Sequence, residues 1–140
     1  MSEQNAELVR EGVAALNEAY RTGDVQAWRR QVEKAFDPDV VLEAGEAFTE
    51  GEWHGHEGAV GFVANQMEVL EDMSIQVDEY ADVDENRILV AITFGGRARH
   101  TGLQVELHPF HVFSLRDGKV LRWQIFQDRG QALEAAGLPG

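Results

Sequence analysis

The sequence predicts an α+β domain in which three N-terminal helices pack on one side of a curved, mainly antiparallel sheet. In most of the first half of the chain, apolar residues recur at three- and four-residue spacing, which is typical of helices. In the second half they alternate with polar residues or run continuously, which is typical of strands. The chain has 140 residues, so we expect a single domain over residues 1–140.

Three apolar stripes predict the helices. The first covers about residues 5–22 and ends at Gly23, because glycine readily takes the left-handed conformation of a helix stop. The second begins after Asp24, whose side chain can cap a helix, and ends before Pro38, since proline cannot continue helical hydrogen bonding. The third has its buried face at residues 59–70.

The strands are predicted from short apolar runs and from the turns between them. One is expected at residues 40–42, before a loop over residues 44–52. Four antiparallel strands are then expected at residues 74–80, 87–99, 103–115 and 119–128. Gly95-Gly96 inside the second of these predicts a bulge or bend that curves the sheet.

The last two strands form a predicted hairpin that sorts side chains between the two faces of the sheet. Asp117-Gly118 is a strong signal for a two-residue turn, which pairs Arg116 with Lys119 and, without any bulge, His111 with Gln124. The pocket face would then also carry Phe113, Arg122, Phe126 and Asp128. The opposite face would be an exposed apolar patch around Trp123, which we expect to form the interface of a homodimer.

Composition excludes several classes of function. The chain has 25 acidic and 12 basic residues, so its formal net charge is −13, and we expect no nucleic-acid partner. It contains neither an apolar run near the roughly 20 residues of a membrane helix nor a signal-peptide pattern, so we expect a cytoplasmic protein without a membrane partner. Cysteine is absent, and neither the histidine spacing nor the glycine pattern predicts a metal or a cofactor.

Four motifs give the chain a resemblance to a known superfamily. They are Gly23-Asp24, Phe36-Asp37-Pro38-Asp39-Val40, Trp53-His54-Gly55, and Arg116-Asp117-Gly118-Lys119-Val120 followed by Trp123, Phe126 and Asp128. In this order, over nearly the whole chain, they resemble the nuclear transport factor 2-like superfamily, most of all its SnoaL-like branch. The resemblance implies a cone-shaped fold with an apolar pocket between helices and concave sheet. It does not select a function, because the superfamily contains cyclases, isomerases, hydrolases, dehydratases, ligand binders and interaction modules.

Two residues are candidate catalytic groups. Asp128 resembles the acid/base aspartate of cyclases and epoxide hydrolases in this superfamily, and an apolar cone would disfavour its charged form, as proton transfer requires. His111 resembles in position the oxyanion-hole aspartic acid of ketosteroid isomerases, where an imidazole could donate a hydrogen bond or act as a base. The structural alternatives are an Asp128 bonded to backbone amides or to Arg129, and a half-buried His111 bonded to Gln124.

The chain departs from the patterns of two enzyme groups that it resembles. The isomerase tyrosine corresponds to Leu16, one helical turn from Tyr20, and the isomerase base corresponds to about Ala44. We therefore do not expect steroid isomerase activity. The Arg-x-Asp motif of the epoxide hydrolases corresponds to Arg97-Ala98-Arg99, which lacks the carboxylate.

We expect a cofactor-independent acid/base enzyme of the isomerase, cyclase or dehydratase type, acting on a small hydrophobic molecule with a carbonyl group. Asp128 would move the proton, while His111 and Gln124 would polarise the carbonyl. The other substrate-binding residues would be Phe113, Phe126, Trp53, Tyr20 and Arg122. Alternatives from other classes are a non-catalytic carrier or sensor of a hydrophobic ligand, and a dimeric interaction module.

Overall fold

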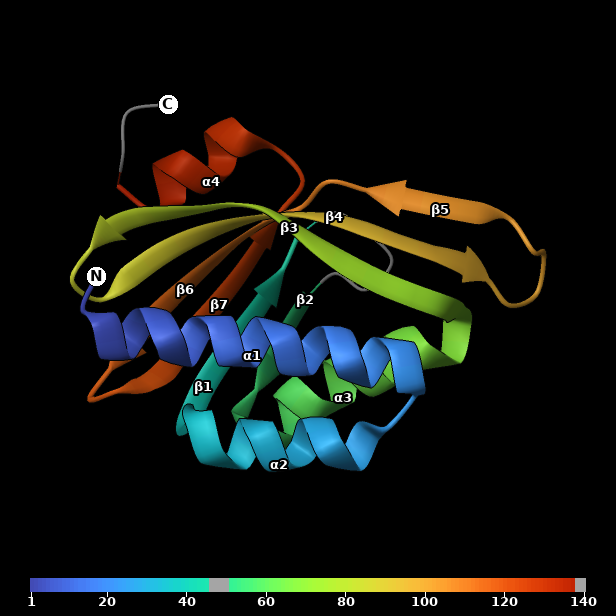
Figure 1. The fold of residues 1–140 in the computed structure, drawn as a ribbon, viewed down its shortest axis with the longest axis horizontal. Coiled ribbons are helices and arrows are strands. Elements are labelled where there is room, and N and C mark those ends of the chain that lie inside the picture. The colour runs from blue at the N-terminus through green and yellow to red at the C-terminus, as the bar shows by residue number, and fades with distance from the viewer. Residues whose placement is uncertain (46–50, 138–140) are drawn as a thin grey trace.

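The computed structural model describes residues 1–45 and 51–137, and it confirms the α+β class with one helix more than predicted (Figure 1). The helices are α1 (Glu3–Thr22), α2 (Val25–Ala35), α3 (Gly55–Val69) and α4 (Arg129–Ala135). The strands are β1 (Phe36–Ala44), β2 (Gly51–His54), β3 (Leu70–Asp84), β4 (Arg87–Ala98), β5 (Gln104–Leu107), β6 (Phe110–Arg116) and β7 (Lys119–Phe126).

One curved, open sheet contains these strands in the order β2-β1-β7-β6-β4-β3, and β5 pairs with β4 alongside this path. All neighbouring strands are antiparallel except β1 and β7, which are parallel. Helices α1, α2 and α3 lie on one face of the sheet, and α4 lies on the other (Figure 1). The main core therefore lies between the sheet and the first three helices.

The predicted stop of α1 at Gly23 and the predicted cap of α2 at Asp24 are confirmed. The side chain of Ser2 accepts a hydrogen bond from the amide of Asn5 at the start of α1, and Gly23 ends this helix with a φ of 74°. Asp24 caps α2 by accepting from the amide of Ala27 over 3.0 Å. Phe36 is already extended, so α2 passes directly into β1.

Three strand predictions need correction. Strand β2 occupies Gly51–His54, so the predicted loop over 44–52 is shorter, and its residues 46–50 lie outside the described part of the chain. The expected strand 103–115 is two strands, because Pro109 has no N–H for a continuous ladder. The irregularity at Gly95-Gly96 lies in β3, where two residues, Asp72 and Met73, lie opposite Gly96, and Asp72 has a φ of 53°.

The fourth helix was not predicted. Helix α4 packs Ala132 and Ala136 on the outer face of the sheet, against Leu89, Val112 and Phe126. Its sequence is short and lacks a strong apolar stripe, so its stability comes from this contact with the sheet.

The hairpin turn is confirmed, but the predicted register beyond it is wrong. Asp117 and Gly118 both have positive φ, as a two-residue primed turn requires, and Arg116 pairs with Lys119. The register then shifts, because Leu121 is an extra residue in β7. His111 therefore pairs with Ile125 instead of Gln124. Since side chains alternate along a strand, this one-residue shift moves every later β7 side chain to the opposite face.

Trp123 consequently lies in the core, and the predicted homodimer surface around it is wrong. Its side chain is 1% exposed. The indole packs against the rings of Trp28, Phe36, Phe62 and Phe113, with centroids 5.5–6.1 Å apart. Burial of these large aromatic surfaces explains why the bulge is favoured over the regular register, which would turn Trp123 and Ile125 to the outer face of the sheet, away from this aromatic cluster.

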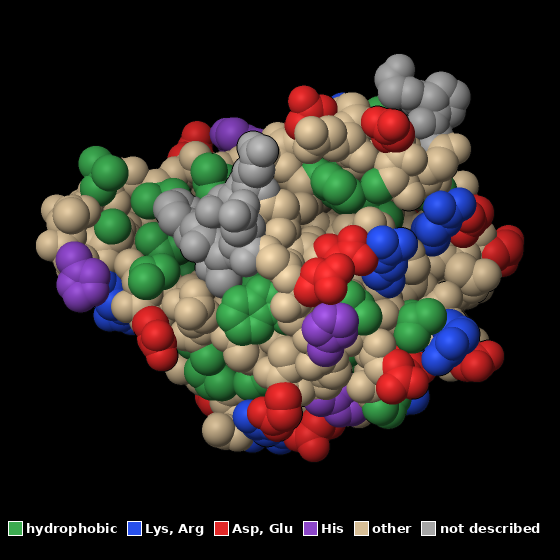
Figure 2. All heavy atoms as spheres, turned by 180° about the vertical axis from the view of Figure 1, so that it is seen from behind, with side chains coloured by type: hydrophobic (Ala, Val, Ile, Leu, Met, Phe, Trp, Pro, Cys, Tyr) green, Lys and Arg blue, Asp and Glu red, His purple; other side chains and the backbone are tan. Residues whose placement is uncertain are grey.

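The surface carries charges of both signs despite the large negative net charge. Figure 2 shows the side of the molecule that is hidden in Figure 1. Charged groups of both signs lie toward the right-hand end of this side, and hydrophobic side chains gather toward the left-hand end. Arg97 pairs with Glu71 and Asp72, and Arg99 also pairs with Glu71, so both arginines of Arg97-Ala98-Arg99 lie in exposed ion pairs. Among residues 1–45 and 51–137, no helix combines the length and apolar character needed to cross a membrane.

Candidate functional site

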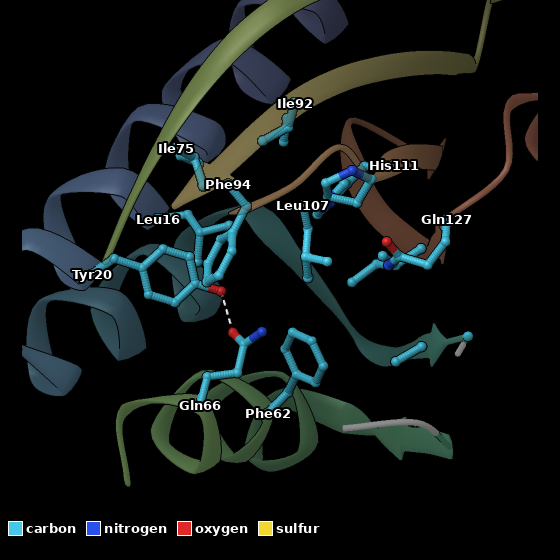
Figure 3. A pocket seen from close by; sticks show the side chains of 14 residues that line it. Leu16, Tyr20, Phe62, Gln66, Ile75, Ile92, Phe94, Leu107, His111 and Gln127 are labelled. Atoms are coloured by element: carbon cyan, nitrogen blue, oxygen red, sulfur yellow. Dashed lines mark hydrogen bonds between the residues drawn. The ribbon is translucent and has the colours of Figure 1, made fainter. Parts of the chain in front are cut away.

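A pocket lies between the sheet and helices α1 and α3 (Figure 3). Its walls are mainly apolar, with side chains from both helices and six strands, among them Leu16, Phe62, Ile75, Ile92, Phe94 and Ile125. The cavity volume, counted as the space that the centre of a water-sized sphere can occupy, is about 50 Å³. Because one water needs about 10–15 Å³ of such space, the pocket fits a small molecule or one group of a larger molecule.

Four polar side chains line this pocket: Tyr20, Gln66, His111 and Gln127. In Figure 3, Tyr20 and Gln66 point toward each other on the helical side, while His111 and Gln127 come from the opposite side. Among the described residues that line the pocket there is no Asp, Glu, Lys or Arg. An ionised ligand would therefore find no described counter-charge in the wall, and burial without one is costly.

His111 is buried and hydrogen-bonded to Trp123, whose indole Nε1 donates to Nδ1 of the imidazole over 2.8 Å. Burial lowers the pKa of His111 to about 3, so the ring is neutral near pH 7. An indole N–H can only donate, so Nδ1 must be the unprotonated nitrogen and the proton of the neutral ring lies on Nε2. His111 is therefore a hydrogen-bond donor through Nε2, and it cannot use this nitrogen as a base.

Tyr20 and Gln66 form a second polar pair in the pocket. The hydroxyl of Tyr20 donates to Oε1 of Gln66. Burial raises the pKa of Tyr20 far above its usual range, so the phenol stays protonated. The bond fixes the amide of Gln66 with its oxygen toward Tyr20, which leaves the two N–H groups of Nε2 as further donors in this part of the wall.

Asp128 does not line the pocket. It is the N-cap of α4, and its carboxylate accepts a hydrogen bond from the amide of Gln131 over 3.1 Å. This is the structural alternative considered for the residue, a strand-end aspartate bonded to a backbone amide. The register shift and the turn into α4 separate Asp128 from His111, with which it was expected to share a face.

Two predicted site residues, Gln124 and Arg122, lie in β7 beside β1, on the opposite face of the sheet from His111. Arg122 forms hydrogen bonds to both carboxylate oxygens of Glu43, and Nε2 of Gln124 donates to the same carboxylate over 3.2 Å. The predicted contact between His111 and Gln124 is therefore wrong, since Glu43 takes the place of the imidazole.

The predicted aromatic wall residues are spread over three places. Phe113 is buried and stacked on Trp123, and it does not line the pocket. Phe126 packs on the outer face of the sheet with α4. Trp53 contacts Phe62, a wall residue, in an edge-on arrangement with ring centroids 5.9 Å apart. Of the predicted site residues, the structure brings Tyr20 and His111 together in the pocket wall.

Gln66 and Gln127 were missed by the sequence analysis, although both had a detectable signal. Gln66 is three residues after Val63 on the apolar stripe of α3, where a lone amide indicates a polar group on a buried face. Gln127 continues the alternation of Trp123 and Ile125. Trp123 and Ile125 are large and apolar whereas the neighbouring Arg122 and Gln124 are polar, so the face with Trp123 was the better candidate for the interior.

Comparisons with known proteins agree with this fold. The profile of the SnoaL-like domain family matches residues 13–123. An NTF2-like protein of unknown function from Burkholderia pseudomallei has 23% sequence identity and a TM-score of 0.72, with 96% of this chain and 97% of that chain covered. A candidate SnoaL-like polyketide cyclase from Jannaschia sp. has 19% identity and a TM-score of 0.72, with 100% and 98% covered.

A third similar structure is that of SalBIII, an epoxide hydrolase/cyclase-like enzyme of pyran ring formation in the polyether salinomycin. It has 18% identity and a TM-score of 0.69, with 91% of this chain and 92% of that chain covered. At these identities the structural likeness establishes the fold. No curated protein matches the chain in sequence.

Proposed function

The chain belongs to the SnoaL-like domain family, and from that premise we propose that its pocket binds a small, neutral, mainly apolar molecule that carries a carbonyl group. The observation that carries this proposal is the bond between Trp123 and His111, which leaves Nε2–H of a buried, neutral imidazole as a donor in an apolar wall. A carbonyl oxygen is a matching acceptor, and the apolar walls suit the remainder of the ligand.

The charge of the ligand follows from the described wall. A carboxylate would meet neutral donors without a cation, and an ammonium group would meet no carboxylate. The negative net charge of −13 further opposes entry of an anion. A neutral ketone or a related carbonyl compound is therefore the ligand class that the pocket favours.

Titration of the protein with cyclohexanone, cyclohexanecarboxylate and methylcyclohexane tests this proposal, with the imidazole ¹⁵N–¹H signal of His111 as the readout. We expect the ketone to shift the Nε2–H signal and to bind most tightly. His111→Phe keeps a ring at this position but removes the donor, and it should weaken ketone binding by about three- to tenfold, as expected for one neutral hydrogen bond. Tighter binding of the carboxylate, or an unchanged affinity for the ketone in His111→Phe, would contradict the proposal.

An acid/base enzyme is the second candidate, because a fixed N–H donor in an apolar pocket is also the arrangement that stabilises an oxyanion. Removal of a proton from carbon needs a base as well. Among the described wall residues the ionisable side chains are Tyr20 and His111. Tyr20 remains protonated, and Nε2 of His111 already carries its proton, so neither group is free to accept a proton from carbon. This disfavours the enzyme and favours a carrier or sensor.

Exchange of the α-protons of cyclohexanone in D₂O separates the two candidates. A carrier or sensor leaves the exchange rate at its buffer value while the ketone is bound. Acceleration by the wild-type protein that is lost in His111→Phe would favour the enzyme and would require a base outside the described wall.

A further inference from the structure

A second apolar cavity lies on the far side of Leu16 from the pocket. Its lining includes Val9, Val13, Trp28, Phe36, Phe113 and Trp123. It is small, with about 10 Å³ of space for the centre of a water-sized sphere. Of the described residues, Leu16 alone lines both this cavity and the pocket.

The two spaces also adjoin at the sheet. Trp123 lines the second cavity and His111 lines the pocket, and these two side chains are joined by a hydrogen bond of 2.8 Å. On the helical side, the 3% exposed side chain of Leu16 separates the spaces. Leu16 belongs to α1, and Figure 3 shows its side chain beside those of Tyr20 and Phe94.

Gly12 keeps the second cavity open from the side of α1. Leu8, Gly12, Leu16 and Tyr20 are four residues apart, so they follow one ridge of the helix. A Cβ atom at Gly12 would have no heavy atom from another part of the fold within 4 Å. Glycine is among the least favourable residues inside a helix, and here no close packing requires it. Its effect is to leave unfilled space one turn before Leu16.

We infer that Leu16 sets the length limit of the ligand, and that the cavity beside Gly12 is the space into which a longer apolar chain would extend. This inference rests on the proposed function, because it takes a ligand whose carbonyl is bound by His111. The occupant is the alkyl chain of that ligand, since the lining beyond Leu16 consists of apolar side chains and Gly12. In the wild-type protein the chain ends against the Leu16 side chain.

A series of straight-chain methyl ketones of increasing length tests the inference by calorimetry. Each methylene that enters apolar space should tighten binding by about fourfold. We expect this gain to stop at a fixed chain length in the wild type. In Leu16→Ala the gain should continue for about two further carbons, so that the longest ketones bind more than tenfold more tightly than to the wild type.

Three further variants make the result specific. Leu16→Val removes less of the side chain, should extend the series by a smaller amount, and tests the same role if Leu16→Ala does not fold. Leu115→Ala makes the same substitution at a buried residue that lines neither space, so it should leave the limit unchanged. Gly12→Leu, added to Leu16→Ala, should fill the second cavity and restore the wild-type limit.

The outcomes distinguish this inference from the proposed function. If no ketone of the series binds to the wild type, the proposed function fails, and the role of Leu16 fails with it. If the wild type shows a length limit that folded Leu16→Ala and Leu16→Val leave unchanged, the role of Leu16 is refuted while ketone binding stands. In a third outcome, affinity keeps rising with chain length in Leu16→Ala, but adding Gly12→Leu does not restore the wild-type limit. That result would refute the second cavity as the space that receives the chain.

Discussion

Trp123 donates its indole N–H to Nδ1 of His111 over 2.8 Å, and this bond connects the aromatic core to the pocket. Because an indole cannot accept a hydrogen bond in the ring plane, the bond decides which nitrogen of the imidazole carries the proton. A residue expected on the surface therefore determines the chemistry of a residue expected in the site.

The first prediction concerns the tautomer of His111. In the wild type near pH 7, the ¹⁵N spectrum should show Nε2 protonated and Nδ1 unprotonated. Trp123→Phe removes the donor, so the proton should distribute over both nitrogens and the ¹⁵N shifts should move toward each other. Loss of the bond should also destabilise the fold by about 1–3 kcal/mol, since a buried acceptor is left without a partner.

Trp28→Phe is the matched control for this variant. Trp28 belongs to the same aromatic cluster, and its indole N–H donates to the carbonyl of Ala59 over 3.2 Å. This variant should lose a similar amount of stability and leave the His111 spectrum unchanged. An altered tautomer in Trp28→Phe, or an unaltered one in Trp123→Phe, would show that the indole of Trp123 does not set the proton position.

The second prediction is a pH-dependent stability from His111. Its pKa is about 3 in the folded protein, well below the ordinary value of 6.5. Between these two values the unfolded chain binds a proton that the folded chain does not, so His111 lowers the free energy of unfolding as the pH falls. The difference in stability between wild type and His111→Gln should change by about 1.4 kcal/mol per pH unit within this window, and it should be constant above pH 7.

Urea unfolding of both proteins from pH 8 to pH 4 measures this difference. Carboxylates titrate in both proteins and cancel in the comparison. His100→Gln, at an exposed position, controls for the loss of a histidine. A difference between wild type and His111→Gln that does not depend on pH would mean that His111 is not held neutral in the folded state.

The third prediction assigns Asp128 to stability. Asp128→Ala removes the cap of α4 and should cost about 1 kcal/mol, whereas Asp128→Asn keeps an acceptor and should cost little. Neither variant should change ketone affinity, because Asp128 does not line the pocket. Thermal unfolding and calorimetric titration measure the two effects. A loss of ligand binding in Asp128→Asn would instead return this residue to the site.

The fourth prediction compares two glycines inside helices. Gly12→Ala adds a Cβ atom into open space and should stabilise the protein by about 0.5–1 kcal/mol. Gly58→Ala should destabilise it, because its Cβ would lie 2.7 Å from the backbone carbon of Trp53. Chemical unfolding of both variants checks the opposite signs. The same sign in both would mean that local helix propensity outweighs the packing differences.

Much of the fold could be read from local sequence because its causes are local. The stripes of α1 and α2, the glycine stop at Gly23, the cap at Asp24 and the turn at Asp117-Gly118 each depend on a few neighbouring residues. The motifs that resemble the SnoaL-like branch have the same character. Tyr20 lines the pocket because it lies on the stripe of α1, and the stripe faces the sheet.

Tertiary packing decided the remainder of the site. The turn fixes the pairs next to it, but burial of Trp123 and Ile125 favours the extra residue at Leu121, and one residue of shift exchanges the faces of β7. That exchange moved Gln124 and Arg122 to Glu43 and brought Trp123 to His111. The turn sequence carries no information about a bulge farther along the strand. By itself, the sequence determined the class of fold and its helical wall, whereas the chemistry of the pocket depended on how the core packs.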